Sequence, residues 1–150
     1  MAIRLSSQAA HALVTRWGLA ALFAGGHVRI YEGAPPARAD DPPQGQLLAV
    51  VTLQGKPEPT AADRSGGLTW QAAGRYGHVQ DTGDWKARAL QSGQPGWWRM
   101  VAFGHAADGS GSSNARMDGQ VGDTLDLGGL AHLAQGQLVN VSFEAHLAPG

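Results

Sequence analysis

The chain has 150 residues, no cysteine, and a net charge of -1 from 11 Lys+Arg and 12 Asp+Glu. This length suits a single domain over residues 1–150 whose core needs no disulfide or metal, and the missing cysteine excludes thiolate catalysis and cysteine-ligated zinc. No basic surplus is available to neutralise phosphates, so we expect no nucleic-acid partner. Charged residues make up 15% of the chain, below the roughly 25% of ordinary soluble domains; this indicates either a surface partly covered by other subunits or loops rich in Gly and Ala.

Residues 1–25 carry one convincing helix pattern. Ser6 or Ser7 can cap the helix, and Gly25-Gly26 ends it. Between them, apolar residues recur at spacings of three and four: Ala10, Leu13, Val14, Trp17, Ala20 or Ala21, and Phe23 or Ala24. This stripe packs on the chain's own sheet or docks onto a neighbour, which makes Trp17 an interface candidate.

The same N-terminal region gives no sign of a membrane segment. Its longest apolar stretch, around Trp17 to Ala24, is far shorter than the roughly 20 residues that cross a bilayer. A signal peptide would have an apolar centre where this chain has Ser6, Ser7, Gln8 and His11. We therefore expect no membrane partner and synthesis in the cytoplasm.

From Gly26 the period changes to two, which predicts a strand with Val28 and Ile30 on its buried face. Residues 33–45 then form a loop in which Pro35-Pro36 and Pro42-Pro43 favour extended, semi-rigid backbone. We interpret this loop as a projecting arm, and its four prolines are interface candidates. The apolar run from Gln46 to Leu53 predicts a central strand covered on both faces.

The middle of the chain alternates loops and short strands. After a proline-containing loop over 55–66, strands are predicted at 68–72 and, as one irregular strand, within 76–91. The Pro95-Gly96 turn leads into a core strand at 97–103, and a hairpin loop over 104–114 joins it to a partner strand at 115–121.

Trp97 and Trp98 are adjacent in the predicted core strand and must point to opposite sheet faces. One of them should be buried and the other should lie on the outer face. An exposed tryptophan there indicates a protein interface, since Trp is a frequent hot-spot residue, or alternatively a platform for stacking sugar rings.

The chain closes with the clearest strand, over 137–147. Val139, Val141 and Phe143 lie on one face of it and are predicted to be core. A shorter strand precedes it at 123–127. Seven or eight short strands after one helix indicate a mainly β fold, an antiparallel β-sandwich or jelly-roll-like domain with one N-terminal α-helix.

No residue pattern indicates a catalytic, metal or cofactor site. The six histidines lack the spacing of metal ligands, and the loop over 108–114 has Gly119 where a calcium loop has its bidentate Glu. Three aspartate pairs could do acid/base work, but each sits among turn residues, where Asp usually accepts backbone N–H bonds: Asp40-Asp41, Asp81 with Asp84, and Asp123 with Asp126.

Three blocks resemble a family of small tailed-bacteriophage proteins. The first is the Arg4-Leu5-Ser6 start with its short helix, then Leu22 to Gly33, the proline/aspartate loop and Gly45 to Ala49. The second is Gly96 to Met100, and the third is Ala134 to Val141 with the closing Ala148-Pro149-Gly150. The family is encoded among virion morphogenesis genes and contributes no catalytic residues.

The resemblance implies a non-enzymatic component of the virion. We expect a capsid decoration or cement protein that binds the major capsid protein as a homo-oligomer, a trimer or a dimer. A tail, tail-tip or head-to-tail connector component is the alternative, and a carbohydrate-binding module for adhesion to the host surface is a second alternative.

Overall fold

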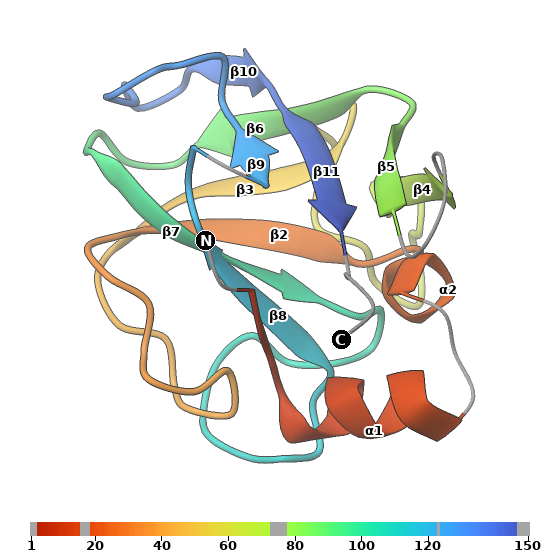
Figure 1. Cartoon of the computed structure of the whole chain (residues 1–150). Coiled ribbons are helices and arrows are strands. Elements are labelled where there is room, and N and C mark those ends of the chain that lie inside the picture. Colours follow the sequence, from red (N-terminus) through yellow and green to blue (C-terminus); the bar gives the residue numbers. More distant parts are fainter. Residues whose placement is uncertain (1–2, 16–18, 73–77, 123, 147–150) are drawn as a thin grey trace.

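The computed structural model describes residues 3–15, 19–72, 78–122 and 124–146. In these residues the chain is mainly β, with two antiparallel sheets and two short helices (Figure 1), as the sequence predicts for the fold class. The larger sheet has seven strands in the spatial order β1 (Arg4–Leu5), β8 (Arg116–Gln120), β7 (Pro95–Val101), β2 (His27–Glu32), β3 (Leu47–Leu53), β6 (Trp85–Ala89) and β10 (Leu138–Asn140). The smaller sheet has four: β4 (Thr69–Ala72), β5 (His78–Thr82), β11 (Ser142–His146) and β9 (Leu125–Asp126).

The N-terminal region differs from the single predicted helix. Arg4 and Leu5 pair with β8, and the helical residues are divided between α1 (Ser7–Thr15) and α2 (Leu19–Phe23). Ser6 is the cap of α1, because its Oγ accepts a hydrogen bond from the Ala9 N–H at 3.2 Å. The same oxygen accepts the Arg116 N–H at 2.8 Å, which ties the start of α1 to β8. Trp17 lies outside the described residues.

The hydrophobic core lies against one face of the larger sheet and contains the residues predicted for it. Val28, Ile30, Val139, Val141 and Phe143 are all buried. Aromatic rings fill the space around Phe143, whose ring centroid lies 5.1 to 5.4 Å from those of three tryptophans: Trp70, Trp85 and Trp98. The prediction of the core from strand periodicity is therefore confirmed.

Two predicted strands each divide between the sheets. The irregular strand predicted within 76–91 is wrong, because β5 belongs to the smaller sheet and β6 to the larger, with a turn at Gly83 (φ 74°) between them. The closing strand divides in the same way, β10 pairing with β6 and β11 with β5. Its inward and outward alternation nevertheless continues through Val141, whose N–H donates to the Trp85 carbonyl at 3.0 Å.

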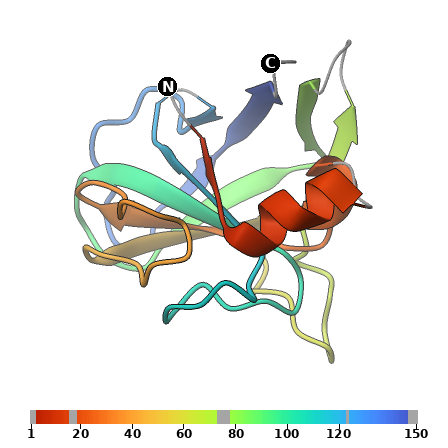
Figure 2. The same cartoon turned by 60° about the horizontal axis from the view of Figure 1, so that its bottom comes forward.

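The predicted hairpin and loops are present. β7 and β8 pair antiparallel across the loop 104–114, as expected from the Gly- and Ser-rich sequence. Figure 2 shows this loop (teal) and the loop 54–67 (yellow) on the side of the larger sheet away from the smaller one. We call that side of the larger sheet the latched face, because loops are fastened to it; it carries the side chains of Arg29, Trp97, Arg99, Arg116 and Asp118.

Candidate functional site

The strand register places a row of charged residues across the latched face. Arg4 of β1 stands opposite Asp118 of β8, Asp118 opposite Arg99 of β7, and Arg99 opposite Arg29 of β2. Their neighbours along the strands, such as Met100 and Met117, point into the core because successive side chains alternate between faces. Four adjacent strands thus contribute charge to one line.

The centre of this row is a buried ion pair. Arg99 donates from Nε to Asp118 Oδ1 at 2.8 Å and from Nη2 to Oδ2 at 2.9 Å, and both side chains are 0% exposed. The remaining Arg99 nitrogen, Nη1, donates to the Ala107 carbonyl at 3.0 Å. Burial raises the pKa of Asp118, against the opposing effect of Arg99. The ion pair therefore fixes the positions of β7, β8 and the loop carrying Ala107 relative to one another, at the cost of removing two charges from water.

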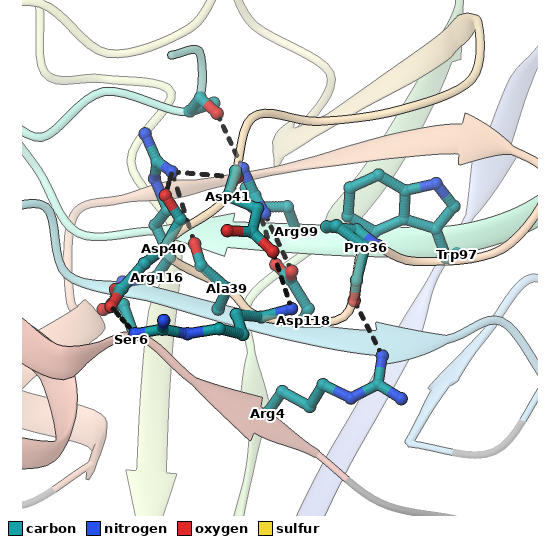
Figure 3. A network of polar contacts seen from close by, with 12 residues as sticks. Arg4, Ser6, Pro36, Ala39, Asp40, Asp41, Trp97, Arg99, Arg116 and Asp118 are labelled. Carbon is teal, nitrogen blue, oxygen red and sulfur yellow. Dashed lines mark hydrogen bonds and ion pairs between the residues drawn. The ribbon is translucent and has the colours of Figure 1, made fainter. Parts of the chain in front are cut away.

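Arg116 joins two loops through backbone carbonyls (Figure 3). Its Nε donates to the Ala106 carbonyl and its Nη2 to the Asp108 carbonyl, both at 2.8 Å. Its Nη1 lies 3.3 to 3.4 Å from three carbonyls of the loop 33–45, those of Ala39, Asp40 and Asp41. Burial lowers the pKa of the Arg116 guanidinium. One side chain holds both loops against the sheet.

The loop 33–45 is folded back onto the latched face, so the prediction of a projecting arm is wrong. Arg4 Nη1 donates to the Pro36 carbonyl at 2.9 Å, and Trp97 Nε1 donates to the Gln44 carbonyl at 3.0 Å. Asp40 accepts both the N–H and the hydroxyl of Ser7, and the hydroxyl in particular lowers the pKa of Asp40. The loop carbonyls, which prolines leave without a helical or sheet partner, find donors on the sheet instead.

The four prolines of this loop differ in exposure: Pro36 is buried, Pro35 and Pro43 are half-buried, and Pro42 is exposed. Their role in contacts with other subunits stays a prediction.

A third loop is held by a carboxylate. Arg29 Nε donates to Glu58 Oε2 at 2.9 Å and Nη2 to Oε1 at 3.2 Å, while His27 Nε2 lies 2.9 Å from the same Oε2. The close contact with His27, together with the hydrogen bonds from Arg29, lowers the pKa of Glu58 to about 2. Arg29 also pairs with Asp108 at 3.2 Å. The loops 54–67 and 104–114 therefore meet at one guanidinium.

Neither Trp97 nor Trp98 is exposed, which overturns the prediction of an outward tryptophan. The two rings do point to opposite faces, Trp98 into the core and Trp97 onto the latched face, but each is 0% exposed. Trp97 stacks on Tyr31 with ring centroids 4.5 Å apart, and the loop 33–45 reaches its indole N–H. Sequence periodicity assigned the face correctly and missed the loop that covers it.

Most of the aspartates suspected of acid/base chemistry accept backbone N–H groups, whereas Asp84 pairs with Lys86. Asp81 Oδ1 accepts the Phe143 N–H at 2.9 Å, and Asp126 Oδ1 accepts the N–H groups of Gly128 and Gly129. Asp123 lies outside the described residues. Within the described ranges, no group of three or more His, Cys, Asp or Glu could hold a metal ion. None of the helices there has the length and apolar content needed to cross a membrane.

Sequence reasoning did not single out Arg29, Glu58, Arg99, Arg116 or Asp118. A usable signal was present: Arg99 interrupts an apolar core strand, and Arg116 and Asp118 alternate with apolar residues in its partner. Such alternation predicts that these side chains lie on a solvated face of the sheet. The pattern therefore identifies their face correctly but does not reveal that loops cover this face.

Comparison with protein families, with characterised proteins and with solved structures found no match to this chain. A functional assignment therefore depends on the sequence and geometry of the chain itself.

Proposed function

We propose that the chain is a non-enzymatic structural protein of a tailed-bacteriophage particle, made in the host cytoplasm, which binds the major capsid protein as a decoration or cement protein. The proposal depends on the resemblance carried by Leu22 to Gly33, Gly45 to Ala49 and Gly96 to Met100. These blocks contribute β2, the start of β3 and most of β7. They are the central strands of the latched face and both ends of the loop 33–45.

The observation that best supports a docking role is the preorganisation of the latched face. Arg29, Arg99 and Arg116 fix three loops in one arrangement before any partner arrives. A surface that is already ordered loses less conformational entropy on binding, which suits a protein that must occupy many equivalent lattice sites. Exposed charges at the loops, such as Arg38 and Asp108, would form the polar rim of the contact.

Within this proposal the two sheets form a sandwich with jelly-roll-like connections, and the protein assembles as a homo-oligomer. The tail, tail-tip or connector alternative shares these features and differs in location. The carbohydrate-binding alternative depended on an exposed Trp97 or Trp98, and both are buried. No observation favours that alternative.

The first test locates the protein in separated heads and tails of purified virions. The proposal predicts its presence in heads at on the order of hundreds of copies, as expected of a symmetric lattice component. About a dozen copies or fewer, found with tails, would replace the capsid assignment with the tail or connector alternative.

The second test measures binding of the purified protein to shells that lack it, by cosedimentation. The charge reversal Arg38→Glu on the loop 33–45 should weaken binding. Gln71→Glu is the control, because it also adds negative charge at an exposed residue, but on β4 of the smaller sheet. Equal binding by both variants would show that the latched face is not the docking surface.

A further inference from the structure

The four edge strands of the two sheets are unequally protected. β1 has only two residues and carries Arg4. β9 is bridged on its far side, where Gly122 N–H donates to the Leu125 carbonyl at 2.8 Å, and α2 packs beside β4 (Figure 1). β10 has neither a charged residue nor a proline among Leu138, Val139 and Asn140. An edge without such protection is a template for pairing with another strand.

The backbone of β10 offers hydrogen bonds outward. The Gln137 carbonyl accepts the Ala89 N–H at 2.9 Å, and the Val141 N–H donates to the Trp85 carbonyl at 3.0 Å. In an antiparallel pair these contacts alternate, so Gln137, Val139 and Val141 face β6. The N–H and C=O groups of Leu138 and Asn140 therefore face away from β6, where no strand of the described residues pairs with them.

Apolar side chains flank the same edge. Leu138 is 46% exposed and Leu90 43% exposed, and together with Leu130 they are the exposed large hydrophobics of the described residues. Leu138 stands opposite Arg88 in the register, and Leu90 lies just past the end of β6, two residues beyond Arg88. The edge thus combines free backbone groups with apolar surface.

We propose that β10 pairs antiparallel with β10 of a second copy of this chain, about a two-fold axis at Val139. In that register Leu138 of each copy stands opposite Asn140 of the other, and their outward N–H and C=O groups form four hydrogen bonds between subunits. The two seven-stranded sheets then continue into one another. The inference deepens the homo-oligomer part of the proposed function and specifies a dimer.

A second copy suits this edge better than an unrelated strand. Two-fold symmetry lets the same two residues satisfy all four outward donors and acceptors, which makes the contact isologous and closed. The Leu138 side chains of both copies lie on the same face of the joined sheet and lose exposure together. The three residues of β10 are uncharged, so no like charges oppose one another in the pairing.

The test is sedimentation of the full chain over a concentration series. The wild-type protein should show a reversible monomer–dimer equilibrium. Leu138→Lys should raise the dimer dissociation constant at least about tenfold, because it places a charge on the pairing edge. Gln71→Lys is the matched control, since it adds the same charge to an exposed residue of an edge strand of the smaller sheet, and it should leave the equilibrium unchanged.

Asn140→Pro provides a second variant that removes an outward N–H without touching the bonds to β6. Its urea midpoint reports whether the subunit still folds, and the dimer should weaken as for Leu138→Lys. A wild-type protein that stays monomeric at all concentrations would overturn the inference, as would a dimer that both variants leave intact. Dimerisation is measured without shells, so loss of shell binding by a protein that still dimerises would refute the proposed function alone.

Discussion

Replacing Arg116 by Met should loosen two loops at once, and its cost can be worked out from the contacts. The bonds from Nε and Nη2 are short and separate, whereas the three contacts of Nη1 share one nitrogen and are long. Counting Nη1 as one effective bond gives three bonds from a charged donor. Each is worth about 1 to 1.5 kcal/mol once competition from water and the packing of the retained Met side chain are allowed for. We expect a loss of about 3 to 4.5 kcal/mol in the free energy of unfolding.

Urea unfolding measures this loss, and amide hydrogen exchange locates it. The Gly111 N–H donates to the Asp40 carbonyl at 3.0 Å and so reports whether the two loops stay together. In the Met variant this amide should exchange faster, while amides of the β2–β3 pair should follow only the global stability. Arg116→Lys should recover part of the loss, because one ammonium cannot reach both loops with the planar geometry of guanidinium.

Arg38→Met is the control for the loss of one arginine from the same region. Arg38 is largely exposed and pairs only with Asp40 Oδ2 at 3.3 Å, so its removal should change stability by less than about 0.5 kcal/mol. An Arg116→Met protein with wild-type stability and unchanged exchange at Gly111 would refute the reasoning that the guanidinium holds the loops.

Three further predictions concern the core and the ion pairs. The pKa of Glu58 is lowered from 4.5 to about 2, so the stability that its carboxylate contributes is present above pH 4.5 and is lost as the pH falls toward 2. Because 34% of the side chain is exposed, we expect this contribution to be about 1 to 2 kcal/mol. In acid unfolding, the stability of Glu58→Gln should therefore change less between pH 4.5 and 2 than that of the wild-type protein. Asp118→Asn leaves the Arg99 guanidinium buried without its carboxylate, so it should lower the free energy of unfolding in urea by about 3 kcal/mol. The double change Arg99→Met with Asp118→Leu removes both charges and should lower it far less. Equal losses for the two proteins would contradict this. Gly119→Ala would place a Cβ 2.4 Å from the Trp98 ring, so it should lower the free energy of unfolding by about 1 to 3 kcal/mol. The measurement is the Tm, which should fall. An unchanged Tm would show that the ring moves freely.

Local patterns predicted most of the strands and the inward face of each. Alternation in Val28 and Ile30, and from Val139 to Phe143, depends only on the two-residue period of a strand, so the chain itself carries that information. The sequence also placed the helix cap at Ser6 or Ser7, and the hydrogen bond from the Ala9 N–H identifies Ser6.

What the sequence did not reveal depends on contacts between distant segments. Gly83 marks a turn in any sequence, but that the strands on its two sides join different sheets is decided by their partners, β11 and β3. Arg99 and Asp118 form a polar outward face when each strand is considered alone. Both are buried, and the loop carrying Ala107 accepts a hydrogen bond from Arg99, while the neighbouring Arg116 binds the loop carrying Ala39.

Several of the few charged residues are used inside the molecule. Of the nine arginines in the chain, three direct their guanidinium groups to loop carbonyls or to carboxylates in the loops or beneath them: Arg29, Arg99 and Arg116. Charge used in this way orders the latched face and contributes little to keeping molecules apart in solution. The pairing edge at β10 is itself uncharged, so little electrostatic repulsion opposes its association with a second copy.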